Sequence, residues 1–221
     1  MNRLLPLLKI VAILFLTFLL LIPMVRIQFL VRERQALRDN VVQEIARSAG
    51  YAQTVTGPLL IVPYTRRLQE QQLDASQKLV TVTREIAGEL RLLPATMDLG
   101  GRLETEERKR GIYKARLFNA DAQLQGRFDI PAYFGVVSDA ASYSFGKPRL
   151  VLGISDIRGI GNALALQANG SSIDFQPGTG TDVLAGGVQA PLALQPVSSA
   201  QALDYRIELK LQGTGDFQVA P

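Results

Sequence analysis

An uncharged apolar run near the N-terminus constrains this chain more than any other feature. From Ile10 to Val25 the sequence reads IVAILFLTFLLLIPMV, in which twelve of sixteen residues are Leu, Ile, Val or Phe. As a helix this run is about 24 Å long, and with the preceding residues from Leu4 it reaches about 33 Å, which brackets the thickness of the hydrocarbon core. Its insertion is favourable by about 4 to 7 kcal/mol. The run predicts a transmembrane helix within residues 1–25 that contacts the lipid bilayer through residues 10–25.

A buried helix of a globular protein and a cleaved signal peptide are the competing interpretations of this run. Arg3 and Lys9 precede it, as a basic segment does in a signal peptide. The residues that follow, RIQFLVRERQALRD, are bulky and charged and contain no Ala-x-Ala-like cleavage site. We therefore expect an uncleaved signal anchor. A soluble domain secreted after cleavage is a third interpretation, which the intact mass of the mature protein would test.

Basic residues do not decide the orientation of the anchor. Two precede the span, and four arginines follow it, at positions 26, 32, 34 and 38. Because the positive-inside rule counts such residues on both flanks, it favours neither orientation here.

We expect the helix to continue beyond the membrane, from Arg26 to Ala49. Apolar residues recur there at helical spacing, with charged residues between them: Ile27, Leu30, Leu37, Val41 and Ile45. The stripe is narrow, so we interpret 26–49 as a juxtamembrane stalk that packs one face on the following domain. A helix on the lipid surface or against a partner is the alternative. Glycines and a proline at 50, 57 and 58 then disfavour further helix.

Beyond Gly57 the apolar residues alternate with polar ones. In DAQLQGRFDI, Ala122, Leu124 and Phe128 alternate with polar side chains, and YRIELKLQ near the C-terminus repeats the pattern. PLLIVPY, KLVTVTREI and GIYKARLF are further short β-rich runs. The fold class predicted for residues 57–221 is therefore mainly β, an antiparallel and sandwich-like domain.

Three glycines occur between Ser155 and Phe175, in SDIRGIGNALALQANGSSIDF, and are the feature that would suggest a phosphate-binding loop. However, GIGNAL has leucine where a dinucleotide-binding loop needs its third glycine, and no Gly-Lys-Ser/Thr sequence occurs. Asn169-Gly170 interrupts the helix that would have to follow, and this dipeptide is best suited to a two-residue hairpin turn. The stretch predicts a strand, a turn and a strand, and we assign no cofactor to it.

Composition excludes several classes of function. The chain has 24 basic and 20 acidic residues, and without Arg3 and Lys9 the formal charge is only +2, which argues against nucleic acid as a partner. Histidine and cysteine are absent, which removes the usual general base, a thiol nucleophile and soft metal ligands.

The remaining candidate side chains are weak, and we predict no catalytic, cofactor-binding or metal-binding residues. Glu104, Glu106 and Glu107 lie in the mixed-charge run ETEERKR, which we interpret as a solvated turn. Asp174 and Asp182 flank QPGTGT but lack the spacing of a calcium loop. Ser155 and Lys147 would form a catalytic pair only if the fold brought them together.

Six segments in this order resemble the cell envelope integrity inner membrane protein CreD family: LLIPMVRIQFLVRERQALRDNVVQEIARS, GPLLIVPY, EERKRGIYKARLF, GKPRLVLGISDIRGIG, FQPGTG and LQGTGDFQVAP. The resemblance covers nearly the whole chain. It implies an N-terminal anchor with its N-terminus in the cytoplasm, a periplasmic β domain and, in the family, further transmembrane helices after that domain. After Val25 no apolar run of this sequence approaches membrane length, so we expect the β domain to be truncated at its C-terminal end.

The resemblance also implies a role in envelope integrity, under the control of a two-component regulatory system, and it supplies no catalytic residues. We therefore expect an inner-membrane protein whose periplasmic domain has a structural or interaction role without catalysis, with envelope partners that stay unidentified. The alternative is a periplasmic enzyme or a lipid- or glycan-binding module. This alternative would require a concave site with convergent polar groups and carboxylates of perturbed pKa around Asp156, Arg158 or Asp174.

Overall fold

The computed structural model describes residues 4–73 and 79–220. Outside the described residues lie 1–3, which include Arg3, and also 74–78 and 221 of the predicted β domain. The elements along the described chain are α1 (Leu4–Ala49), β1 (Gln53–Leu73), β2 (Leu79–Leu92), β3 (Thr96–Arg110), β4 (Tyr113–Ile130), η1 (Ala132–Gly135), η2 (Ala140–Ser142), β5 (Tyr143–Phe145), β6 (Arg149–Ile154), η3 (Ile157–Gly159), β7 (Ala165–Ala168), β8 (Ser171–Asp174), β9 (Gln176–Pro177), β10 (Gly187–Pro191), β11 (Gln201–Thr214) and β12 (Phe217–Ala220).

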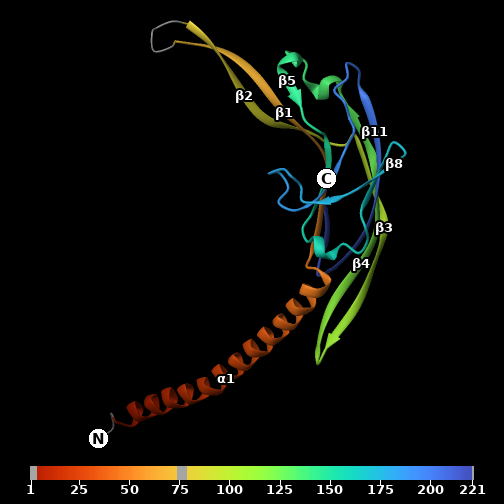
Figure 1. The fold of residues 1–221 in the computed structure, drawn as a ribbon. Coiled ribbons are helices and arrows are strands. Elements are labelled where there is room, and N and C mark those ends of the chain that lie inside the picture. Colours follow the sequence, from red (N-terminus) through yellow and green to blue (C-terminus); the bar gives the residue numbers. More distant parts are fainter. Residues whose placement is uncertain (1–3, 74–78, 221) are drawn as a thin grey trace. The chain divides into compact units, whose positions relative to one another are not determined.

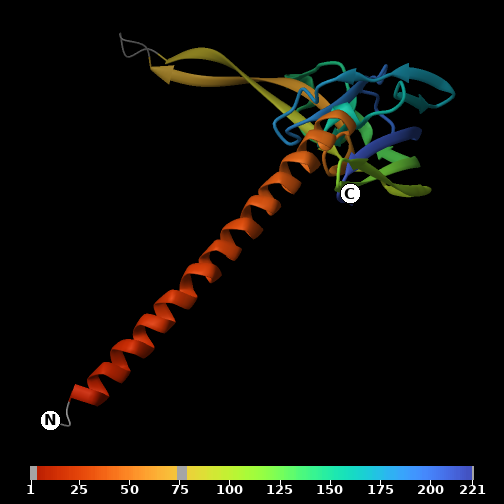
Figure 2. The same ribbon diagram turned by 90° about the horizontal axis from the view of Figure 1, so that it is seen from below.

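The chain divides into two compact units, and α1 makes up most of the first, which consists of Met1–Ile45 and Arg108–Ala115. Figure 2 shows α1 as one continuous helix, although Pro23 lies inside it. Proline is more frequent in transmembrane helices than in soluble ones. The most apolar window of α1 has a mean hydropathy of 2.7, and none of it is buried, so this helix is long and apolar enough to cross a membrane. The predicted N-terminal helix and its extension beyond Val25 are confirmed.

The second unit, Ala46–Glu107 and Arg116–Pro221, contains two β-sheets. The seven-stranded sheet has the order β12-β1-β6-β10-β9, with β2 and β5 also paired to β1. The five-stranded sheet has the order β3-β4-β11-β7-β8 (Figure 1). The register pairs are antiparallel except between β1 and β12, which run parallel. The mainly β, antiparallel fold class is therefore confirmed.

The core lies between the two sheets. Alternate residues of β11, such as Ile207 and Leu209, and of β4, such as Leu124 and Phe128, are buried in one cluster with Leu150 of β6 and its neighbours. The side chains between them on β4 and β11 are mostly charged or polar and lie on the opposite face of the five-stranded sheet. The alternation in the sequence thus identified both faces of these strands.

Three boundaries differ from the predictions. The first strand begins at Gln53 and not after Gly57, because residues 53–56 pair with β12 at the far end of the chain. GIYKARLF and DAQLQGRFDI form one long strand, β4, and not two. The run ETEERKR is exposed as expected but belongs to strand β3, and the turn follows it at Gly111.

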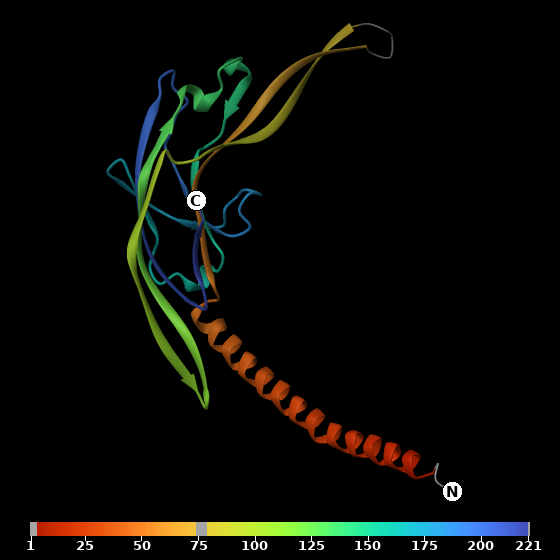
Figure 3. The same ribbon diagram turned by 180° about the vertical axis from the view of Figure 1, so that it is seen from behind.

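Two strand pairs form hairpins of different length. β1 and β2 stay in register from Leu60 and Leu92 to Leu73 and Leu79, and Figures 1 and 3 show this hairpin projecting from the rest of the sheet. β7 and β8 form the short hairpin predicted between Ser155 and Phe175. Asn169 and Gly170 both have positive φ, of 46° and 81°, as a type I′ turn requires.

Candidate functional site

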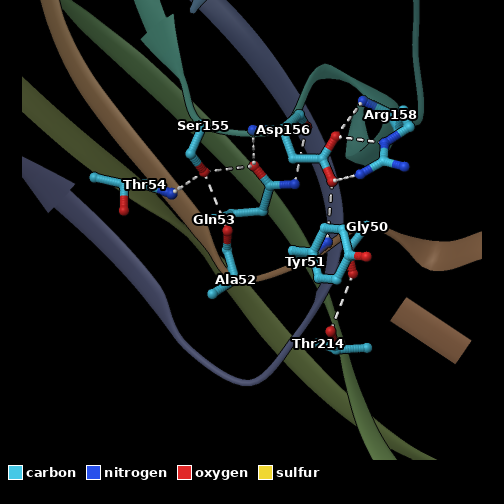
Figure 4. A network of polar contacts seen from close by, with 9 residues as sticks. All are labelled: Gly50, Tyr51, Ala52, Gln53, Thr54, Ser155, Asp156, Arg158 and Thr214. Carbon is cyan, nitrogen blue, oxygen red and sulfur yellow. Dashed lines mark hydrogen bonds and ion pairs between the residues drawn. The ribbon is translucent and has the colours of Figure 1, made fainter. Parts of the chain in front are cut away.

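A network of polar contacts joins three segments of the β domain (Figure 4). The first segment is Gly50–Thr54, directly after α1; the second is Ser155–Arg158, between β6 and the end of η3; and the third is Thr214 at the end of β11. α1 ends here because Gly50 takes a positive φ of 95° and donates its N–H to the carbonyl of Ala46, 2.8 Å away. The hydroxyl of Thr214 then donates to the Gly50 carbonyl at 3.1 Å.

Gln53 lies at the centre of this network and is fully buried. Its Nε2 donates to the Asp156 carbonyl at 2.9 Å, and its Oε1 accepts the Asp156 N–H at 3.4 Å. The Ser155 hydroxyl lies 3.5 Å from the same Oε1. A buried amide without partners would cost several kcal/mol, so these contacts are what allow a glutamine in this position. The sequence analysis did not select Gln53, because a lone glutamine in a short linker carries no pattern.

The Asp156 carboxylate is hydrogen-bonded both within its own turn and to the linker after α1. It accepts the backbone N–H groups of Tyr51 and Arg158, both at 3.1 Å, and pairs with the Arg158 guanidinium at 2.9 Å. The hydrogen bond from Arg158 is the main cause that lowers the pKa of Asp156 below its usual 3.8. The guanidinium also lies over the Tyr51 ring, 5.2 Å from its centre. The Asp156 side chain, only 10% exposed, is therefore a satisfied structural carboxylate and not a poised acid.

The Ser155 hydroxyl is also engaged in hydrogen bonds with backbone groups. Its Oγ accepts the N–H of Thr54 at 2.9 Å and donates to the Ala52 carbonyl at 3.1 Å. These bonds join Ser155, which follows β6, to Ala52 in the linker and to Thr54 at the start of β1. The contacts of Ser155 do not include Lys147, so the fold gives no support to a serine–lysine pair.

Close backbone contact explains the glycines of GISDIRGIG. A Cβ on Gly159 would collide with the Gln212 carbonyl and the Gln53 amide, and Gly161 donates its N–H to the Lys210 carbonyl at 2.7 Å. The turn can lie against β11 only because no side chain separates them. The glycine-rich stretch therefore allows this turn to pack closely against β11 and against Gln53 at the start of β1.

FQPGTG forms a second structural cluster. Arg149 of β6 pairs with Glu89 of β2 at 2.6 Å and also donates to the carbonyl of Gly180. Thr181 donates to the other oxygen of Glu89 at 2.8 Å, and the buried Thr179 hydroxyl donates to the Leu184 carbonyl at 2.8 Å. These bonds fix the loop that leads to β10.

The other candidate carboxylates do not converge. Glu104, Glu106 and Glu107 lie exposed on β3, Asp174 ends β8, and Asp182 lies exposed in the loop before β10. Within residues 4–73 and 79–220, no group of three or more carboxylates is placed to hold a metal ion. The structure thus brings Ser155, Asp156 and Arg158 together, but their contacts serve to attach the linker.

Comparison with known proteins extends this description. The family described as "Inner membrane protein CreD" matches residues 6–221. Inner membrane protein CreD of Escherichia coli (strain K12) is 34% identical over 203 residues, which are 92% of this chain and 43% of that relative. The chain therefore spans less than half the length of the curated relative it matches. No solved structure matches it.

The match extends through both parts of the chain. It begins within the apolar helix, at residue 6, and includes the linker network, the GISDIRGIG turn and the end of β12. The resemblance predicted from the six segments is confirmed, and the chain belongs to the CreD family of inner membrane proteins.

Proposed function

We propose that this protein contributes to the integrity of the cell envelope by holding a β domain on the periplasmic side of the inner membrane, in a structural or interaction role and without catalysis. The proposed organisation is a transmembrane anchor over 1–25, a juxtamembrane helix over 26–49 and a periplasmic domain over 57–221. The family supports the inner membrane as the location. The cytoplasmic placement of the N-terminus follows from the family resemblance and is part of the proposal.

The observation that carries this proposal is the linker network. In the linker between α1 and β1, the Gly50 carbonyl accepts a hydrogen bond from Thr214 and the Tyr51 N–H donates to Asp156. Gln53, the first residue of β1, donates to the Asp156 carbonyl, and a mobile tether needs none of these bonds. Gly/Ser-rich segments are the usual solution where a domain swings freely. A buried glutamine and a bidentate ion pair in this position instead indicate that the start of the β domain must be fixed.

The chemistry of the same residues supports a role without catalysis. Ser155 and Asp156, the best nucleophile and acid of the network, both have their polar atoms engaged by backbone groups or by Arg158. A general base needs a lone pair that can reach a substrate, and the Asp156 pairing with a lowered pKa opposes protonation of that carboxylate.

The first test is protease accessibility of the full chain with a C-terminal tag, in intact cells, in spheroplasts and after lysis. We expect the β domain to be cleaved in spheroplasts while the membrane fraction retains the anchor under alkaline wash. Protection until lysis would place the domain in the cytoplasm and refute the proposed orientation and the envelope role with it.

The second test separates an attachment role from catalysis. In cells that lack their own copy, we would measure leakage of a periplasmic reporter after mild detergent, with the full-length protein or its variants expressed at equal membrane levels. We expect Gln53→Leu to increase leakage relative to the wild-type protein, because it removes the linker bonds. Asp174→Asn and Asp182→Asn should behave as wild type. Loss of function in either aspartate variant, with normal protein levels, would instead favour the enzyme alternative.

A further inference from the structure

A row of polar side chains crosses the outer face of the five-stranded sheet. Arg206 of β11 is in register with Gln125 of β4 on one side and with Gln167 of β7 on the other, and Gln167 is in register with Ser172 of β8. Asp98 of β3 extends the row, since it accepts a hydrogen bond from the Gln125 amide at 3.2 Å. Five neighbouring strands each contribute one polar residue, so the row is about 19 Å long at the usual spacing between strands.

Hydrogen bonds hold the β4 side of this row in place. The Gln123 amide donates to Gln125 Oε1 at 2.9 Å, and the Arg206 guanidinium reaches the same oxygen at 3.4 Å. Gln125 thereby keeps a fixed rotamer with its amide directed to Asp98. Side chains fixed before binding lose less conformational entropy when a ligand arrives.

The face that carries the row is hollowed. A groove of about 810 Å³ is lined by Asp98, Gln125, Gln167, Ser172 and Arg206 with their neighbours from Thr96 and the Asn169–Gly170 turn. A second hollow of about 520 Å³ shares Asp98 and Gln125 and continues over the paired glycines 100 and 101 toward Glu208 and Lys210. Both volumes fall within the usual size of small-molecule sites.

The residues that line the groove indicate which class of ligand it can bind. Its charged residues are Asp98, Asp204 and Arg206, a balance of −1 that disfavours anionic ligands such as nucleic acid. The described carboxylates do not cluster for a cation. Among the lining residues, Met97 and Tyr205 are the large apolar ones, which is too little to receive a lipid chain. The groove is lined by amide, hydroxyl and paired charged groups. Such groups can form hydrogen bonds with a ligand that carries many hydroxyls.

We propose that this groove binds an uncharged saccharide chain, with its sugar hydroxyls paired to Gln125, Gln167 and Arg206. The amides donate and accept at once, as the two sides of a sugar hydroxyl require. This inference rests on the proposed periplasmic placement of the domain, because that compartment is where envelope glycans would reach the groove.

Binding is tested with the full chain in detergent micelles, by calorimetry with two uncharged probes, a tetramer of N-acetylglucosamine and a β-linked glucose hexamer. We expect saturable binding of at least one probe. The Gln125→Ala and Gln167→Ala changes should each weaken it about threefold to tenfold, as expected for one lost hydrogen bond.

Gln218→Ala is the matched control, because Gln218 is an exposed glutamine on β12 of the other sheet. It should leave the affinity unchanged, and the thermal unfolding midpoint of each variant shows that it is folded. The proposal is overturned if neither probe binds at about 10 mM, well above the millimolar constants of weak complexes. It is equally overturned if binding survives both groove substitutions. Neither result bears on protease accessibility in spheroplasts, so failure of this inference and failure of the proposed function are distinguishable.

Discussion

Replacement of Gln53 by leucine is the sharpest test of the linker network. The two side chains are similar in size, so the substitution leaves little cavity and mainly removes hydrogen bonds. The Asp156 carbonyl loses its donor at 2.9 Å, and the Asp156 N–H loses a weaker acceptor at 3.4 Å. A buried group left unsatisfied costs about 1–3 kcal/mol. Because the second contact is long and Asp156 is only partly buried, we expect a total loss of about 2 kcal/mol in the free energy of unfolding.

The assay is thermal unfolding of the full chain in micelles, followed by the circular dichroism of the β-sheets. For a domain of this size, about 2 kcal/mol corresponds to a decrease of roughly 4–8 °C in the unfolding midpoint. Gln218→Leu, at an exposed position of β12, is the control and should change the stability by no more than about 0.5 kcal/mol. Equal midpoints for Gln53→Leu and this control would refute the conclusion that the network stabilises the start of the β domain.

Three other substitutions test separate parts of the argument. Gly159→Ala should cost about 1–3 kcal/mol through its collision with the Gln212 carbonyl, whereas Gly100→Ala, with open space around it, should be near neutral in the same unfolding assay. The lowered pKa of Asp156 means that its contribution is complete above pH 3.8 and is lost as the pH falls through the folded-state pKa. Urea unfolding at several acid pH values should therefore show a steeper loss of stability for the wild-type protein than for Asp156→Asn. Burial raises the pKa of Tyr205 from 10.0 to about 12, so stability present below pH 10 should decline between these values, and Tyr205→Phe should reduce that decline.

Local patterns in the sequence predicted the elements that depend on neighbouring residues. The apolar run gave the helix, the alternation in 121–130 and 205–212 identified strands β4 and β11 with their buried faces, and Asn169-Gly170 gave the turn between β7 and β8. In each case the decisive interactions lie within a few residues, so propensity and periodicity carry the information.

Features that depend on distant pairing could not be predicted in this way. Strand β1 begins at Gln53 because of its parallel pairing with β12, more than 160 residues away in the sequence. The close contact of Gly159 with β11 and the partners of Gln53 arise from the same long-range assembly. Glycines in GISDIRGIG look alike whether they bind phosphate or admit a neighbouring backbone. Asp156, selected as a possible perturbed carboxylate, has a shifted pKa for a structural reason, its pairing with Arg158.

The groove was missed for a related reason. Its five aligned residues come from five strands, and in each strand the residue is simply the expected polar member of an alternating pair. The signal was present only in the pattern across strands, which the register of the sheet creates.

The linker network and the groove share strand β11 but are physically separable. Arg206 lies in the groove and Thr214 in the network, eight residues apart along the strand, or about 27 Å at 3.4 Å per residue. Substitutions at such separation with no shared partner act additively within about 0.5 kcal/mol. A change at Gln53 should thus leave saccharide affinity intact, and a change at Gln125 should leave the attachment of the linker intact. Each experiment therefore measures one site. If a substitution at one site changed the affinity or stability measured at the other, β11 would have to transmit an effect that the described contacts do not explain.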